Sequence, residues 1–351
     1  MSKTVAVIEG EDSSPEAMRP VVELLSDLLP EIRWVYPKVG ESAIDEFSTS
    51  FPREARQAID QADTTLFGST SGPSGAALRY LRWGKDTYAN VRPCRYLPGC
   101  FSPLRYPDGI DFVIVRENLE DLYVGIEGDL QELKFLEKEA RSSGQHISHY
   151  VNGRYALKII TQEGTQRIVR FACELARKRE SKRKVTCVTK HNMLHRTDGY
   201  FLKIAEAMVE EYSDLSFESY IVDDFACRLI REPQEFDVVV TPNLYGDILS
   251  DAAGGLLGSL GMSASGCYGD KYAYFEPAHG TAPDIAGTNT INPTATLLSA
   301  TMMLDYLKYE STAKNLQRAI ETVYGKGISL TPDQNGTATS SQFVEAVREC
   351  L

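Results

Sequence analysis

Long apolar runs are missing from this chain of 351 residues. The longest are short, such as residues 112–115 and 238–240, whereas a membrane-spanning helix needs roughly 20 apolar residues. The first residues enter a strand pattern at once, without the apolar stretch and cleavage site of a secretory signal. These absences argue against a membrane protein and favour a cytoplasmic location.

Basic residues are in the minority, since 37 lysines and arginines stand against 49 aspartates and glutamates, a net charge of −12. Nucleic acid and anionic membranes require a positive field, so neither is expected as a partner. A site for an acidic substrate must therefore gather arginines locally. The seven cysteines are scattered and form no Cys-x-x-Cys pair, which indicates reduced thiols and neither disulfides nor a zinc site.

The Gly-x-Gly-x-x-Gly fingerprint of Rossmann dinucleotide-binding proteins is also absent. What the chain does have is an alternation of strand and helix patterns, which predicts an α/β fold. Its length exceeds what one hydrophobic core supports, so two domains are expected. The expected strands are residues 5–8, 64–67, 111–115, 185–188 and 236–240, and the expected helices are residues 15–29, 165–179, 246–260, 294–308 and 313–323.

The most informative stretch, residues 241–262, is rich in glycine and contains Asp247 and Asp251. A spacing of four places both carboxylates on one face of a helix, where like charges repel unless a cation lies between them. A divalent cation with oxygen ligands would explain the pair, and a solvated helix face would explain two aspartates alone. The surrounding glycines and the strand and turn that precede the helix favour a metal site.

Six segments follow one another along the chain: residues 88–93, 115–123, 190–192, 243–251 with 258–261, 275–287 and 292–295. In this order they resemble the isocitrate/isopropylmalate dehydrogenase family, closest in look to NAD-dependent isocitrate and homoisocitrate dehydrogenases. The resemblance implies a two-domain α/β fold without the Rossmann fingerprint. A discontinuous cofactor-side domain would contain residues 1–87 plus 258–351, and a central domain, 88–257, would carry the contacts of a homodimer or a multiple of it.

The resemblance also implies an oxidative decarboxylation that depends on Mg²⁺ or Mn²⁺. Asp247 and Asp251 match two metal ligands, and Asp223 matches the third, which comes from the partner subunit. Tyr123 and Lys190 match the proton-transfer pair, Lys190 also being supplied by the partner. A lysine beside a metal site is easily desolvated, and its lowered pKa suits a base.

Three arginines match the family's substrate-binding positions: Arg82, Arg92 and Arg116. Guanidinium groups stay charged and bind carboxylates through two parallel hydrogen bonds. A lone arginine more often forms a surface salt bridge, so the flanking motifs carry this assignment. The substrate implied is a 2-hydroxy acid with a carboxylate on C3.

The cofactor implied is NAD. His279, Gly280 and Asn292 match residues that line the adenosine pocket. Family members that prefer NADP carry a basic residue and a tyrosine where this chain has Asp284 and Ile285. An acidic side chain accepts hydrogen bonds from a ribose 2′-hydroxyl but repels a 2′-phosphate.

The first loop departs from the family pattern. Residues 10–16 read Gly-Glu-Asp-Ser-Ser-Pro-Glu, where the family usually has Gly-Asp-Gly-Ile-Gly-Pro-Glu. Asp12 and Ser14 thus replace glycines, and residues with a Cβ restrict positive φ and close backbone approach. The path of this loop beside the cofactor is therefore an open question at the level of sequence.

The segment that sets substrate choice also departs. Ala76 and Leu78 stand where isocitrate enzymes carry serine and asparagine, and Arg79 lies one helical turn from Arg82. Arg79 either faces solvent or binds a further carboxylate. We expect homoisocitrate first and isocitrate second, ahead of isopropylmalate, malate or tartrate. The rival is a non-catalytic regulatory subunit, but such subunits usually lose the metal aspartates or the tyrosine–lysine pair.

Overall fold

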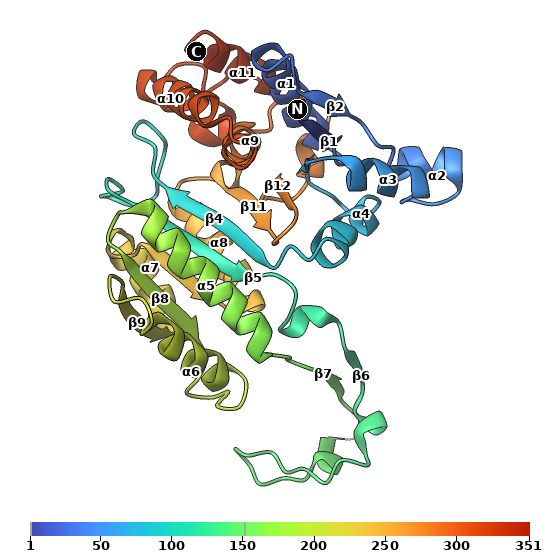
Figure 1. Ribbon diagram of the computed structural model, residues 1–351, viewed down its shortest axis with the longest axis vertical. Coiled ribbons are helices and arrows are strands. Elements are labelled where there is room, and N and C mark those ends of the chain that lie inside the picture. The colour runs from blue at the N-terminus through green and yellow to red at the C-terminus, as the bar shows by residue number, and fades with distance from the viewer. Residues whose placement is uncertain (1, 151) are drawn as a thin grey trace.

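The computed structural model describes residues 2–150 and 152–351 (Figure 1), and one sheet runs through them. Three neighbouring pairs of strands are antiparallel: residues 264–268 with 273–277, 264–268 with 89–95, and 89–95 with 111–117. All other neighbours in this sheet are parallel. The predicted α/β class is confirmed. The order is β2 (Arg33–Val35), β1 (Thr4–Ile8), β3 (Thr64–Phe67), β12 (Ala273–Pro277), β11 (Ala264–Tyr268), β4 (Ala89–Arg95), β5 (Asp111–Glu117), β10 (Val238–Thr241), β8 (Lys184–Thr189) and β9 (Ser216–Ile221).

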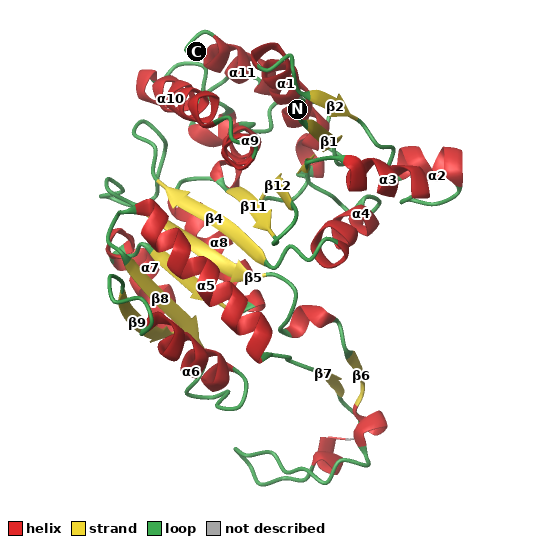
Figure 2. Cartoon of the chain, viewed as in Figure 1, coloured by secondary structure: helices red, strands yellow, loops and turns green. Residues whose placement is uncertain are grey.

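Helices cover both faces of the part of the sheet that contains β5 (Figure 2). Val113 and Val115 share a core with α5 (Gln162–Arg179) and α6 (Asp198–Val209). Phe112 and Ile114 share a core with α7 (Val222–Arg231) and α8 (Asn243–Leu256). Successive strand residues point to opposite faces, so burial on both sides explains why these strands are continuous apolar runs.

The beginning and the end of the chain form one structure because β3 pairs in parallel with β12. Helix α1 packs against α11, and α9 packs against β11 and β12. A single core contains Val5 and Leu297 together with Phe112 and Val239, so the expected division into residues 1–87 plus 258–351 and 88–257 stays a prediction. The helices of this part are α1 (Ser14–Leu28), α2 (Glu41–Phe47), α3 (Arg53–Gln61), α4 (Gly75–Arg79), α9 (Thr294–Tyr306), α10 (Glu310–Lys326) and α11 (Ser340–Arg348).

The helix predicted over residues 246–260 was misplaced by about a turn, since α8 begins at Asn243 and ends at Leu256. Gly258 explains the earlier end. Its φ is +95°, and a Cβ there would lie 2.0 Å from the carbonyl oxygen of Phe101. Only glycine fits such a position, where the chain leaves the helix.

An arm extends away from the rest of the protein (Figure 1). It contains β6 (Glu127–Asp129) and β7 (Arg154–Ala156), which pair antiparallel. It exposes apolar side chains, among them Phe135 and Tyr150. Within the part of the chain that the structure describes, no helix combines the length and apolar character that crossing a membrane requires.

Candidate active site

Helix α8 presents Asp247 and Asp251 to two arginines. Arg92 Nη1 donates to Asp251 Oδ1 at 2.9 Å, and its Nη2 lies 3.3 Å from Asp247 Oδ1. Arg116 Nη1 forms an ion pair with the same Asp247 oxygen. The structure therefore brings together four of the residues predicted from the sequence, two as metal ligands and two as substrate-binding groups.

The two arginines come from neighbouring strands, Arg92 from β4 and Arg116 from β5, and both are almost completely buried. Helix α8 lies very close to β5. A Cβ on Gly246 would be 2.6 Å from Cβ of Arg116, so a glycine is needed for the helix to approach. The motif's glycine thus sets the distance at which Asp247 meets its arginine.

Mutual charge effects show in the pKa values of this cluster. Burial raises the pKa of Asp251; Arg92 offsets this only in part, and Asp247 adds to it. Burial also acts on Asp247, but Arg116, the hydrogen bond from Tyr123 and Arg92 hold its pKa below the ordinary value. Burial and then Arg92 lower the pKa of Arg116 to about 10. The charges of Arg116 and Asp251 are thus the two that a further ligand of opposite charge would stabilise.

Tyr123 reaches the same carboxylate from the short helix η2 (Leu122–Val124). Its hydroxyl donates to Asp247 Oδ2 at 2.5 Å, and its ring centroid lies 5.0 Å from the guanidinium of Arg116. Burial, followed by the hydrogen bond to Asp247, raises the pKa of Tyr123. The phenol therefore holds its proton at neutral pH, as a proton donor must.

Asp223 and Lys190 do not join the cluster around Asp247 and Asp251. Asp223, in the first turn of α7, forms an exposed ion pair with Lys190 Nζ, and this hydrogen bond lowers the pKa of Asp223. Across residues 2–150 and 152–351, no three Asp, Glu, His or Cys side chains come close enough to hold a metal ion. One chain therefore supplies two metal-type carboxylates, Asp247 and Asp251, whose oxygens suit a hard divalent cation.

Arg79 and Arg82 differ in their surroundings. Arg82 is mostly buried; its Nε donates to the Tyr274 hydroxyl at 3.1 Å, and its Nη2 lies 3.4 Å from Glu276 Oε1. Arg79 is exposed and forms no ion pair with any residue the structure describes. Helix α4 ends at Arg79 and continues as a π-helical turn, η1 (Tyr80–Gly84), so the two arginines are not separated by a regular α-helical turn.

A cavity of about 380 Å³ gathers most of the predicted cofactor residues. Asp284 does not line it and is exposed on the short helix η7 (Pro283–Ile285) beside it. His279 Nε2 is buried without a hydrogen-bond partner among the described residues, and burial lowers the pKa of His279. An unsatisfied donor or acceptor in a cavity fits a ligand that pairs with it. The predicted residues that line it are His279, Gly280, Ile285 and Asn292.

The structure shows the path of the first loop, residues 10–16, which the sequence left open. Gly10 keeps a φ of +78°, and a Cβ there would lie 2.1 Å from the Ser69 carbonyl oxygen. Asp12 adopts a φ of +53°, in the left-handed region that aspartate tolerates better than most residues. Ser14 begins α1, and its hydroxyl donates to the Glu9 carbonyl and accepts from Ser69 N. The two replaced glycines are thus accommodated without disrupting the loop.

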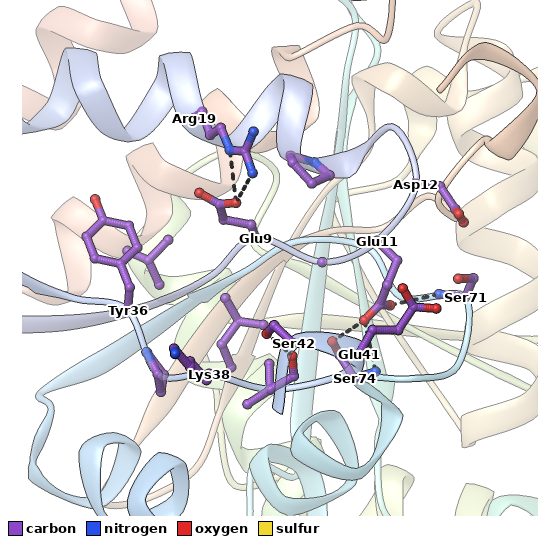
Figure 3. Close-up of a pocket in the computed structure, with 16 residues that line it drawn as sticks. Glu9, Glu11, Asp12, Arg19, Tyr36, Lys38, Glu41, Ser42, Ser71 and Ser74 are labelled. Atoms are coloured by element: carbon purple, nitrogen blue, oxygen red, sulfur yellow. Dashed lines mark hydrogen bonds and ion pairs between the residues drawn. The ribbon is translucent and has the colours of Figure 1, made fainter. Parts of the chain in front are cut away.

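Beside this loop lies a second cavity of about 670 Å³ (Figure 3). On its wall the Glu11 carboxylate accepts hydrogen bonds from the backbone of Ser71 at 3.2 Å and of Ser74 at 2.9 Å. Arg19 pairs with Glu9 on the other side (Figure 3). Glu11 therefore ties the first loop to the start of α4, the helix that carries Arg79.

Two residues that hold the arginines were not assigned from the sequence. Asn243 Oδ1 accepts from Arg116 Nε at 2.9 Å and from its Nη2 at 2.7 Å. Ser250 accepts from Arg92 Nη1 at 2.6 Å. Both belong to the same short motif as Asp247 and Asp251, so their place in that motif was the available signal.

The chain is an α/β protein in which buried arginines, paired carboxylates and a phenol form an anion-binding site next to potential metal ligands. The family model described as isocitrate/isopropylmalate dehydrogenase matches residues 4–347. The chain therefore belongs to the isocitrate/isopropylmalate dehydrogenase family, which is one of decarboxylating oxidoreductases. Members are generally metal-dependent, use NAD or NADP and act on small hydroxy acids.

The relatives carry several substrate names. The 3-isopropylmalate dehydrogenase of Methanothermobacter thermautotrophicus is 39% identical over 100% of this chain and 99% of that protein. The isocitrate/homoisocitrate dehydrogenase of Thermus thermophilus is 38% identical, with the same coverage. The crystal structure of isocitrate dehydrogenase from Methylococcus capsulatus superimposes with a TM-score of 0.86 at 32% identity, covering 99% of both chains. These names support the family and leave the substrate undecided.

Proposed function

We propose that this protein catalyses the NAD- and Mg²⁺- or Mn²⁺-dependent oxidative decarboxylation of a 2-hydroxy-3-carboxy acid. The observation that carries the proposal is the cluster of Asp247, Asp251 and Tyr123 with two buried arginines. Arginines recognise the substrate carboxylates, and the aspartates offer oxygen ligands to a cation. We also propose a cytoplasmic enzyme, whose net charge of −12 disfavours nucleic acid and anionic membranes as partners.

The protein residues would divide the proton transfers between them. Arg82, Arg92 and Arg116 hold the substrate carboxylates. When bound by Asp247 and Asp251, a divalent cation supplies Lewis acidity at the substrate hydroxyl. Lys190 of the partner subunit would accept the hydroxyl proton, and NAD⁺, when bound, would supply the acceptor for the C2 hydride. The bond from C3 to its carboxylate then breaks to release CO₂, and Tyr123 gives its proton to C3.

The proposed enzyme is a homodimer or a multiple of one. Apolar side chains are exposed on the elements that carry Asp223, Asp247 and Lys190: Ile230 on α7 is 60% exposed, Ile248 on α8 60%, and Met193, just after Lys190, 62%. Covering such side chains is favourable on association. An interface there would also deliver Asp223 and Lys190 to the partner's Asp247 and Asp251.

A turnover panel tests the proposed function directly. The protein is assayed with NAD⁺ and Mn²⁺ against homoisocitrate, isocitrate, isopropylmalate, malate and tartrate. Production of NADH and CO₂ in equal amounts from any of them supports it. Absence of turnover with the whole panel favours the rival, a regulatory subunit, which the presence of Tyr123, Lys190 and all three aspartates makes the weaker candidate.

Within the panel we expect homoisocitrate first and isocitrate second, because Arg79 is exposed and free to bind a third carboxylate. A hydrogen bond to a charged group is worth about 1.5–3 kcal/mol, so Arg79→Ala should lower kcat/KM for the tricarboxylate roughly 10- to 150-fold. Malate lacks that carboxylate and serves as the control, with little change. Isopropylmalate as best substrate, or an unchanged ranking in the variant, would place Arg79 on the solvated surface.

Cofactor choice is proposed to depend on Asp284. The carboxylate next to the adenosine cavity should favour NAD⁺ over NADP⁺ by repelling the 2′-phosphate. The double variant Asp284→Lys, Ile285→Tyr should raise kcat/KM for NADP⁺ by roughly 10- to 150-fold, the value of one charged hydrogen bond. Asp45→Lys, an equal charge change at an exposed position of α2, should leave the preference unaltered. Faster turnover of the unmodified protein with NADP⁺ would refute this assignment.

A further inference from the structure

A lysine outside the predicted site, Lys158, has a side chain only 12% exposed and lies between two buried aspartates. Lys158 Nζ is 2.7 Å from Asp198 Oδ1 and 3.3 Å from Asp121 Oδ1, and both aspartate side chains are completely inaccessible to solvent. The same ammonium lies 4.3 Å from the ring centroid of Tyr245. Ile159, the next residue, forms an antiparallel bridge with Asp121, which fixes the backbone on which Lys158 stands.

The two aspartates use their remaining capacity on backbone N–H groups. Asp198 Oδ2 accepts from the Lys190 N–H at 2.6 Å. Asp121 Oδ1 accepts from Leu122 N at 2.8 Å, and its Oδ2 accepts from Leu244 N at 3.0 Å. One buried ion cluster therefore holds three separate segments of the chain.

Each of these segments carries part of the proposed chemistry. Lys190 is the proposed base, Leu122 precedes Tyr123, and Leu244 lies in the first turn of α8, one turn before Asp247. Two ionised carboxylates in a solvent-free position repel each other unless a cation separates them. Without that cation their mutual repulsion would be uncompensated, and their bonds to the backbone would loosen.

We propose that Lys158 is a positioning residue, which holds the backbone of Lys190, Tyr123 and the start of α8 in the geometry that turnover needs. The proposal rests on the proposed function, since it assigns Lys158 a role through the proton-transfer pair. It goes beyond that function because Lys158 itself touches neither substrate nor cofactor. Where Lys190 serves the partner's site, one Lys158 supports groups of both active sites in the dimer.

The test compares Lys158→Met with a matched control, Arg179→Met. Arg179 has a similar arrangement away from the site: it joins buried Asp237 to half-exposed Asp111, at 2.9 Å each, and Asp237 accepts from backbone N–H groups of residues 182 and 184. Both variants remove a cation from a buried aspartate. Both should therefore lower the melting temperature, and only one should disturb the active site.

For Lys158→Met we expect kcat to fall about 10- to 100-fold with little change in the KM of the substrate, the usual effect of losing a group that orients catalytic residues. Hydrogen–deuterium exchange should accelerate at the amides of Lys190, Leu122 and Leu244. Arg179→Met should accelerate exchange at residues 182 and 184 and leave kcat near the unmodified value. Equal losses of kcat in both variants, or unchanged exchange at Lys190 in Lys158→Met, would overturn the proposal.

A second variant covers the case in which Lys158→Met does not fold. Lys158→Gln keeps one hydrogen-bond donor and removes the charge, so a smaller loss of kcat with unchanged KM is expected, and an unaltered kcat contradicts the proposal. Failure of the proposed function is recognised separately, because the unmodified protein would then show no turnover. The exchange experiment needs no turnover and would still decide whether Lys158 holds these three segments.

Discussion

Asp251→Asn should abolish turnover almost completely while leaving the fold intact. Asparagine keeps the size and loses the negative charge that a divalent cation requires. Metal-ion catalysis contributes several kcal/mol of transition-state stabilisation, so a loss of about 4 kcal/mol or more, roughly a thousandfold in kcat/KM, is expected. The free energy of unfolding should change little, because Asp251 is half exposed and, among the described residues, its ion pair is with Arg92 alone.

Metal binding can be measured without turnover. Mn²⁺ should raise the melting temperature of the unmodified protein, and Asp251→Asn should lose that increase. Chelation should remove activity, and Mg²⁺ or Mn²⁺ should restore it. Full activity after exhaustive chelation would contradict the metal assignment. Asp224→Asn is the matched control, since Asp224 stands next to Asp223 but pairs with Arg228 on the surface of α7.

Asp251→Asn, combined with Asp223→Asn, also tests whether the partner subunit completes the site. Asp223→Asn alone should be as inactive as Asp251→Asn. In a mixed dimer, one site then contains both substitutions and the other contains neither. Random mixing makes about half of the dimers mixed, each with one intact site, so roughly a quarter of the unmodified activity should return. No recovery on mixing would show that Asp223 does not act across the interface.

Tyr123→Phe should lower kcat by about 10²- to 10⁴-fold, the range that a positioned acid contributes. Phenylalanine keeps the ring beside Arg116, so substrate binding and folding should change little. The missing hydroxyl is the one that donates to Asp247 and whose raised pKa keeps it protonated. Loss of proton delivery should be visible in the step after hydride transfer.

Single-turnover measurements distinguish this role from a structural one. In Tyr123→Phe, NADH should form in an early burst faster than the final product is released. The control is Tyr155→Phe, which removes a hydroxyl that donates to Glu132 on the exposed arm and should leave kcat unchanged. Unaltered kcat in Tyr123→Phe would refute its role as the proton donor.

Local patterns were enough to predict most of the α/β elements. The predicted strand at residues 64–67 is observed with those bounds, and the helix at 165–179 extends N-terminally to Gln162. The antiparallel strands β11 and β12 were not predicted from the sequence. They are buried through pairing with β3 and β4, whose paired residues lie about 175–209 positions away in the chain, and no local period reports such a pairing.

The candidate site divides in the same way. Short motifs named Asp247, Asp251, Arg92, Arg116 and Tyr123 as functional residues, because the motif fixes the residue types and their spacing. The sequence could not predict which arginine pairs with which aspartate. Arg92 meets Asp251 because β4 and β5 run antiparallel under α8, and the approach of α8 depends on a glycine.

The sequence by itself determined the α/β class, the family, and the residue types available for binding a metal, an acid and a nicotinamide cofactor. These follow from local periodicity and from motifs in which the chemistry is carried by side-chain type. The tertiary structure alone decided that Asp12 takes a left-handed conformation and that Asp223 pairs with Lys190 away from Asp247. It also placed Lys158, whose side chain is 12% exposed, between Asp121 and Asp198, because a charge can be stabilised away from solvent only where the fold brings opposite charges from distant segments to meet it.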